Sequence, residues 1–272
     1  MRERTPPRLL VGGMLLALVA GLALVAAWWT PVAEPLRLRM RARLLAPGSE
    51  AWFGTDALGR DTFSLLMLGA GQTLVVAVVS VLIGAALGTA IGLLAALRGG
   101  RLERALMRAM DLLFAFPPVL SALMLGAALG AGRTSAIAAI ALFTLPVFAR
   151  VARNGARRVL AQDFVRAARA LGVPGAGIVR RHVLPAIGGE VAVQASIQMG
   201  LAVITEAGLS FIGVGPPPPA PSWGRMLADA QTYLGPAPWL LAAPAGAIAL
   251  LVLGFNLAGD GLRDLLDPRR AR

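Results

Sequence analysis

The stretch Gln72-TLVVAVVSVLIGAALGTAIGLLAA-Leu97 contains no charged residue. It is longer than the roughly 20 helical residues that cross the hydrocarbon of a bilayer at about 1.5 Å per residue. Gly84, Gly88 and Gly92 recur at a spacing of four, which places them on one helix face and lets a neighbouring backbone approach closely. The stretch therefore predicts a membrane-spanning helix with a close helical neighbour.

The composition of the whole chain agrees with this prediction. Of the 272 residues, 57% are hydrophobic and 15% are charged, whereas a soluble domain is about a quarter charged. The charges fall in clusters between long apolar runs, as a bilayer requires because hydrocarbon solvates apolar side chains and water does not. We therefore expect an all-α integral membrane protein.

Two residue types are missing, and each absence excludes a kind of chemistry. There is no Cys, so the chain has no disulfide and no Cys-ligated zinc. Every basic residue other than His182 is Arg, and a phosphate-binding loop of the G-x-x-x-x-G-K-[ST] kind needs its Lys. If the protein is driven by ATP, the ATPase is therefore a separate polypeptide.

Six apolar segments are long enough, or nearly so, to be transmembrane helices. The first ends in Trp28-Trp29, an aromatic pair typical of a membrane interface, and we interpret it as a retained helix rather than a cleaved signal peptide. Prolines at 117, 118, 146 and 244 predict kinks. The segments are Leu9–Trp29, Gln72–Leu97, Met107–Leu129, Thr134–Ala149, Val191–Ile212 and Trp239–Ala258.

The distribution of arginine predicts the orientation. With the N-terminus inside, 19 of the 26 arginines fall in cytoplasmic segments, so the positive-inside rule puts both termini in the cytoplasm. The cluster Arg37–Arg43 in the first outer loop is the exception. The seven outer arginines are Arg37, Arg39, Arg41, Arg43, Arg60, Arg133 and Arg225.

The longest cytoplasmic loop, residues 150–190, reads as a helix–turn–helix. Its first half, to Leu171, has good helix formers, and Gly172 then supplies a turn that a Cβ would obstruct. A second short helix is expected over Ala176–His182, before Leu184-Pro185. From the residues alone this arginine-rich surface could lie on anionic lipid or bind a protein. Nucleic acid is the least consistent partner, although a basic helix–turn–helix has that outline.

The same loop resembles a known signature. The residues Ala167-Ala168, Gly172, Ile178 and Leu184-Pro185 are similar to the EAA motif of ABC-importer permeases, which reads E-A-A, three residues, G, a spacer, I and L-P. The resemblance implies a coupling helix that docks in a groove of an ATPase subunit. Arg166 stands where the family often has Glu, so this chain departs from the motif there.

Three further stretches resemble the dipeptide/oligopeptide/nickel importers, and specifically their C-type permease. They are Gly54-TDALGR-Asp61, Ile204-TEAGLSFIGV-Gly215 with Pro221-SW-Gly224, and Gly259-DGLRDLLD-Pro268. The resemblance implies the transmembrane domain of a type-1 ABC importer. The domains expected are 1–65 (first helix and outer loop), 66–268 (importer domain, with the coupling loop 150–190) and 269–272 (basic cytoplasmic tail).

The partners that the resemblance implies are a second, homologous permease, two cytoplasmic ATPase subunits that hold the ATP, and an extracytoplasmic binding protein. This chain would bind no cofactor or nucleic acid of its own and would be no enzyme. The cargo would be a peptide or a related solute such as nickel. The alternatives are an ion-gradient-driven secondary transporter, which commonly shows internal repeats that are not seen here, and a non-transporting membrane component.

Several polar residues have a structural and a functional interpretation. Gly54, Thr55, Asp56, Gly59, Arg60 and Asp61 form a turn-rich loop with Asp–Arg pairing available, which either caps the outer mouth or docks the binding protein. Asp111 and Glu206 are carboxylates near membrane depth, where polar residues are often functional. We expect Asp111 to pair with Arg108, and Glu206 with Arg225 or backbone. His182 is the single histidine, which favours a packing or partner role over a metal site, and Pro216–Pro219 predicts a rigid strap.

Overall fold

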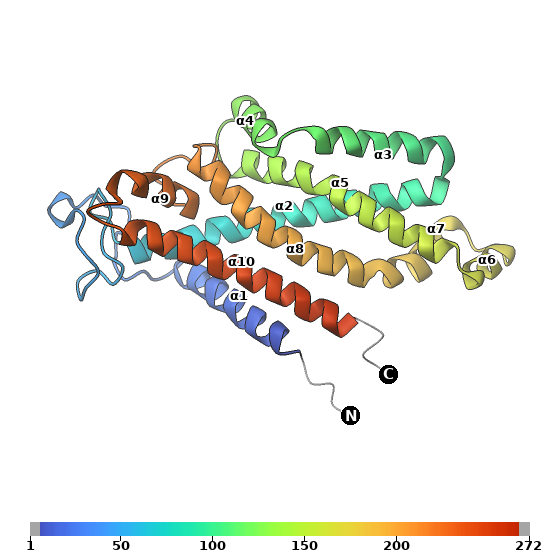
Figure 1. The fold of residues 1–272 in the computed structure, drawn as a ribbon, viewed down its shortest axis with the longest axis horizontal. Coiled ribbons are helices and arrows are strands. Elements are labelled where there is room, and N and C mark those ends of the chain that lie inside the picture. Colours follow the sequence, from blue (N-terminus) through green and yellow to red (C-terminus); the bar gives the residue numbers. More distant parts are fainter. Residues whose placement is uncertain (1–5, 267–272) are drawn as a thin grey trace.

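The computed structural model describes residues 6–266 as a bundle of long helices that run roughly alongside one another (Figure 1). The predicted tail at 269–272, Pro268, and Arg2 and Arg4 lie outside the described residues. In chain order the elements are α1 (Pro7–Val25), η1 (Met40–Ala42), α2 (Thr62–Arg98), α3 (Gly100–Ala115), α4 (Pro118–Leu129), α5 (Arg133–Leu160), α6 (Asp163–Ala170), α7 (Gly175–Ile178), η2 (Val179–Val183), α8 (Leu184–Phe211), α9 (Trp223–Ala230), η3 (Gln231–Tyr233) and α10 (Trp239–Leu266).

The predicted all-helical membrane architecture is confirmed. Among residues 6–266, five helices are long and apolar enough to cross a membrane: α1, α2, α5, α8 and α10, with α8 extended by the α7 and η2 segment before it. The pair α3 and α4, which bend by 87° at the break between them, gives a sixth crossing if the two helices form one span, so the predicted count of six is the upper of the two counts that residues 6–266 allow. Pro117 and Pro118 follow Phe116 and cannot continue the hydrogen bonds of α3, so the predicted kink is a complete break.

Four helices, α2, α5, α8 and α10, are longer than hydropathy predicted, and α5 and α2 show two reasons. The segment Thr134–Ala149 is part of α5, which continues to Leu160 because the arginines from Arg150 onward are good helix formers that end the apolar run and not the hydrogen bonding. At its start, α2 extends back to Thr62, where the Asp61 carboxylate caps it by accepting the Ser64 N–H at 2.7 Å. The expected boundary between domains at residue 65 falls inside α2 and stays a prediction.

The glycine face of α2 packs against α5, as its spacing predicted. A Cβ on Gly84 would meet the Thr144 side chain, and one on Gly88 or Gly92 would meet a backbone carbonyl of α5. All three glycines are buried. The two backbones therefore lie in close contact through the centre of the bundle, and side chains such as Val81 and Phe148 complete the core there.

The bundle has two distinct ends (Figure 1). One, here called the α6 end, holds α6, α7 and the connection from α2 to α3, and it is the end toward which the start of α1 and the end of α10 lie. The other, the α9 end, holds α9 and the long segment between α1 and α2. The two loops that resemble importer signatures therefore lie at opposite ends of the molecule.

Candidate functional sites

At the α6 end, α6 is a short helix fixed on one face only. The chain bends at Ala161 and Gln162 after α5, which divides the single helix expected up to Leu171. Val165 is fully buried and packs in a small apolar cluster with Ile178 and Val183. Ala167 on the same helix is exposed, and Ala168 is half-buried. The segment therefore presents small side chains on an outer face, while its inner face holds it to the bundle.

The turn after α6 has the geometry of a Schellman motif. The Gly172 N–H donates to the Arg169 carbonyl at 2.9 Å, and the Val173 N–H donates to the Ala168 carbonyl at 3.1 Å. Gly172 has φ +81°, but no atom lies within 4 Å of a Cβ built on it. The expectation that a Cβ would obstruct this turn is therefore wrong: a side chain would be strained by its backbone conformation and would not collide.

The segment after the turn runs straight into the membrane helix. α7 continues through the π-helical η2 into α8, so the second short helix predicted over Ala176–His182 does not end before Leu184. Leu184 and Pro185 are exposed at the start of α8, and Pro185, which has no N–H to donate, directly follows the π-helical η2. The His182 ring lies edge-on to Phe164 of α6, with centroids 5.6 Å apart, so it packs between the two halves of the loop.

Arg166, the departure from the family motif, lies on the exposed face of α6. Its guanidinium is 3.4 Å from the Asp163 carboxylate and donates to the Ala161 carbonyl at 3.2 Å. The side chain is 71% exposed and that of Asp163 is 94% exposed, so the pair lies in solvent and holds little energy. Three more arginines of the loop are exposed nearby: Arg169, Arg180 and Arg181.

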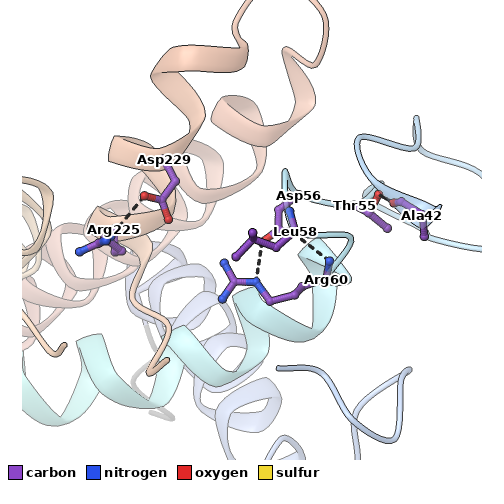
Figure 2. A network of polar contacts seen from close by, with 7 residues as sticks. All are labelled: Ala42, Thr55, Asp56, Leu58, Arg60, Arg225 and Asp229. Atoms are coloured by element: carbon purple, nitrogen blue, oxygen red, sulfur yellow. Dashed lines mark hydrogen bonds and ion pairs between the residues drawn. The ribbon is translucent and has the colours of Figure 1, made fainter. Parts of the chain in front are cut away.

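At the α9 end, the loop from Gly54 to Asp61 is closed by its own polar side chains. The Asp56 carboxylate accepts the N–H of Leu58 at 2.9 Å, the N–H of Arg60 at 2.8 Å and the Arg60 Nε at 2.7 Å (Figure 2). An isolated antiparallel bridge joins Thr55 to Asp61 across the turn. The predicted Asp–Arg pairing is therefore confirmed, and it is local, between residues four apart.

This loop also holds the segment that precedes it. The Thr55 hydroxyl donates to the Ala42 carbonyl and accepts the Leu45 N–H at 2.8 Å. Gly54 and Gly59 have φ +70° and +72°, and a Cβ on Gly59 would collide with the Arg39 carbonyl. Both glycines are needed for a left-handed backbone and for close approach. The loop from Gly54 to Asp61, named here the clamp, therefore holds the segment before it in place.

A cavity of about 440 Å³ lies between this loop and α9. Its walls include Leu58, Tyr233 and residues 218–221, so the second half of the predicted proline strap, Pro218 and Pro219, lines it. Arg225 and Asp229 of α9 line the same cavity as the loop from Gly54 to Asp61, and they pair with each other at 3.2 Å (Figure 2). The charged residues that line this cavity thus form two ion pairs, Asp56 with Arg60 on the loop and Asp229 with Arg225 on α9.

Glu206 does not meet Arg225, contrary to expectation. Its carboxylate is fully buried and accepts the Thr73 hydroxyl at 2.9 Å and the Ser210 hydroxyl at 2.7 Å. Thr73 belongs to α2, so its bond joins two membrane helices, whereas Ser210 lies one turn after Glu206 on α8 itself. Hydroxyl groups satisfy the carboxylate where water is excluded, which explains how it is tolerated there.

Asp111 has a different partner from the one predicted. Its carboxylate pairs with Arg150 of α5 at 2.7 Å and not with Arg108, one turn back on α3. The Arg150 guanidinium also lies 4.8 Å above the Phe114 ring, in a cation–π contact. The contact joins α3 to α5 and could not be read from sequence because 39 residues separate the two side chains.

Two carboxylates that the sequence analysis did not single out join the same region. Glu103 of α3 accepts a bond from Arg153 Nε at 2.5 Å and lies 3.4 Å from Arg157, both on α5. Glu190 of α8 accepts two bonds from Arg158, each 2.5 Å. An acidic residue inside an arginine-rich segment is the one sequence signal that could have found them. Both pairs fasten the last turns of α5, just before α6.

Comparison with known proteins gives matches of three kinds: a family model, curated relatives and solved structures. Residues 88–272 match the family model described as binding-protein-dependent transport system inner membrane component. The glutathione transport system permease protein GsiD of Pectobacterium atrosepticum is 42% identical over 223 residues, which cover 82% of this chain and 74% of the relative. GsiD of Escherichia coli O6:K15:H31 is 43% identical over the same share. Among solved structures, the methionine ABC transporter MetNI in an inward-facing conformation matches with a TM-score of 0.64 and 22% identity, covering 75% of this chain and 97% of that one.

Proposed function

This chain belongs to the family of binding-protein-dependent transport system inner membrane components and is a permease of an ABC importer, and we propose that separate ATPase subunits drive it through the segment from α6 to η2. The site residues of this coupling segment are Arg166, Ala167, Ala168, Gly172, Ile178, Leu184 and Pro185. The proposal assigns them to contact with the ATPase, or to the support of that contact.

The observation that carries this proposal is the position of α6 between two long membrane helices. α5 ends two residues before α6, and η2 continues without a break into α8. A displacement of α6 by an ATPase would therefore move both helices directly. The small, exposed side chains of Ala167 and Ala168 leave room for another protein surface, while Val165 and Ile178 hold the inner face in the apolar cluster.

The ion pairs near α6 support the same transmission. Arg153 joins α5 to α3 through Glu103, and Arg158 joins α5 to α8 through Glu190. Arg153 and Glu103 are partly to largely buried, where an ion pair is screened less than in open water. The end of α5 is thus fastened to both neighbours, so that the three helices would move together.

The proposal includes an orientation and a set of partners. The protein is a multi-pass protein of the inner membrane, and we place the α6 end and both termini in the cytoplasm because most arginines lie there. The ATP would be bound by two partner ATPases, since this chain has no Lys for a phosphate-binding loop. A second, homologous permease would complete the pathway, and a binding protein would deliver cargo at the α9 end.

For the cargo we propose a small peptide. Two relatives that this chain covers over most of their length are named glutathione transport permeases, and glutathione is a short peptide. The specificity of such a system would lie largely in the binding protein, so peptides of similar size are included in the proposal. Nickel, which the family resemblance left open, has no support from these relatives.

The test is uptake by the reconstituted complex of both permeases and the ATPases in proteoliposomes. Labelled glutathione and a labelled dipeptide are supplied with the binding protein outside and ATP inside. Uptake that needs both ATP and the binding protein, and that continues when ionophores collapse the ion gradients, is expected. Uptake that runs on an ion gradient without ATP would contradict the proposal and favour a secondary transporter.

A further inference from the structure

The segment Leu36–Leu45 alternates apolar and basic residues, at the end of the molecule where the positive-inside rule expects few arginines. Nothing in the import cycle proposed above uses these side chains. Three of them, Arg39, Arg41 and Arg43, are named here the arginine ridge. All three are exposed.

The positive charge of the ridge is not balanced by the part of the chain that the structure describes. Within residues 6–266, none of the three arginines takes part in an ion pair, whereas the neighbouring Arg37 pairs with Glu34 at 3.0 Å. Arg43 contacts an uncharged partner, since it donates to the Tyr233 hydroxyl at 3.3 Å with its guanidinium 5.7 Å from the ring centre.

Of the acids that follow the ridge along the chain, Glu50 is exposed and forms no ion pair with it, and the next two are engaged elsewhere. The carboxylate of Asp56 is taken by Arg60, and that of Asp61 caps α2. On α9, Asp229 is taken by Arg225. Among residues 6–266 the ridge therefore has no acidic partner, and its three positive charges are complementary to an acidic surface of another molecule.

The ridge is held in a fixed shape. The Arg39 N–H donates to the Leu58 carbonyl at 2.9 Å, and the Leu44 N–H donates to the Asp56 carbonyl at 3.1 Å. The side chain of Leu44 packs against Ala237 and Leu240 in a small apolar cluster. Charges on a preorganised backbone lose less entropy on binding than charges on a flexible loop. The clamp between Gly54 and Asp61 therefore has a second consequence: it positions the arginines.

The location of the ridge favours a soluble partner over lipid. Figure 1 shows the segment between α1 and α2 reaching beyond the ends of α1 and α10, past α9. Trp28 and Trp29, typical of a membrane interface, come directly after α1, before this segment begins. Beside the ridge, Tyr233 forms part of the wall of the 440 Å³ cavity, whose proline-lined side is apolar. Charge and an apolar recess thus lie next to each other.

We propose that the arginine ridge and the adjoining cavity form the docking surface for an acidic face of the extracytoplasmic binding protein. The ridge steers and orients the encounter, and an apolar side chain of the binding protein enters the cavity. This inference rests on the proposed function, because it names the chemistry of a partner which that function requires.

The experiment measures how the binding protein of this importer stimulates ATP hydrolysis by the purified complex in nanodiscs of neutral lipid. The variant is R39Q/R41Q/R43Q. The charge-retaining variant is R39K/R41K/R43K, and the matched control is R37Q, on the same segment but already paired with Glu34. We expect the Gln variant to raise the half-maximal concentration of binding protein about fivefold or more at low salt, and to flatten its dependence on salt. The Lys variant and R37Q should stay within about twofold of wild type.

Each outcome has a definite meaning. A Gln variant with the half-maximal concentration and salt dependence of wild type would overturn the inference. A defect seen in the Lys variant as well would overturn the electrostatic argument, and a defect confined to nanodiscs of anionic lipid would assign the ridge to headgroups and overturn it too. A wild-type complex that the binding protein does not stimulate would instead contradict the proposed function itself.

Discussion

Gly172 and Gly213 each follow the end of a helix and form the same type of turn, one at each end of the bundle. Both have a left-handed backbone, with φ +81° and +87°, and neither has an atom within 4 Å of a Cβ built on it. In each, two hydrogen bonds close a Schellman motif, from Gly172 and Val173 at the α6 end and from Gly213 and Val214 at the α9 end. The sequences around them, Leu171-GV-Pro174 and Ile212-GV-Gly215, are also alike.

The surroundings of the two turns differ. Val214 is buried in the main core, and its carbonyl accepts the Gly132 N–H at 3.2 Å, so the turn at the α9 end is tied into the bundle. The turn at the α6 end follows an eight-residue helix whose outer face is exposed, and Leu171 beside it is 84% exposed. The same local chemistry thus stops a membrane helix in one place and shapes a protruding surface in the other.

The largest loss of stability is expected where a glycine is needed for space, which neither turn requires. A Cβ on Gly224 of α9 would collide with the carbonyl of Ala207 on α8, at the contact between the two helices. Gly224→Ala should therefore destabilise the protein by about 3 kcal/mol, the upper range for overpacking. Thermal unfolding in detergent measures it. A melting temperature equal to that of wild type would show that α9 is free to shift, and that the α9 end is less rigid than described.

A smaller and equal loss is expected at the two turns. Gly172→Ala and Gly213→Ala each place a side chain in the left-handed region without a collision, which costs about 1 to 2 kcal/mol. Thermal unfolding of the two variants should give similar melting temperatures, both above that of Gly224→Ala. A much larger loss at Gly213 alone would break the comparison, because its buried neighbours would then respond to the strain.

The buried carboxylate at the α9 end should contribute about as much as one such turn. Glu206→Ala leaves the buried hydroxyls of Thr73 and Ser210 without their acceptor and removes one hydrogen bond between α2 and α8, so it should cost about 1 to 2 kcal/mol. Glu206→Gln keeps an acceptor oxygen and should cost less. The difference between the two melting temperatures measures the contribution, and equal losses would mean that charge matters there and hydrogen bonding does not.

The smallest effect is expected for the pair of Asp111 and Arg150. Both side chains are well exposed, at 61% and 41%, so Asp111→Asn should change stability by less than about 1 kcal/mol. The same scan of thermal unfolding checks it. A loss as large as that of Glu206→Ala would show that the pair is covered by a partner, which the isolated chain does not reveal.

Local features of this molecule were predictable from sequence, and contacts between distant segments were not. The glycines of α2, the turn at Gly172 and the pair of Asp56 and Arg60 depend on residues within one or two turns of one another, and all were found. Glu206 meets Thr73 across 133 positions and Asp111 meets Arg150 across 39, and both partners were predicted wrongly.

The ends of the helices were predicted wrongly for a different reason. Hydropathy marks only the part of a helix that lies in the hydrocarbon, whereas α5 continues as a helix past Ala149 into a segment rich in arginine. The apolar runs themselves were found: five helices among residues 6–266 can cross the membrane, and the predicted sixth crossing requires that the bent pair α3 and α4 forms one span. The bounds were wrong because hydrogen bonding within a helix does not stop where the hydrocarbon does.

The coupling role of α6 is tested most directly by the amount of ATPase that stays with the tagged permease in mild detergent, for Gly172→Leu and its matched control Gly213→Leu. Both variants place the same side chain in the same strained turn, so equal damage to the fold is expected. Gly172→Leu should lose most of its ATPase and Gly213→Leu should retain the wild-type amount, with the second permease recovered in both. Equal retention of the ATPase by the two variants would contradict the assignment of the segment from α6 to η2 as the coupling site.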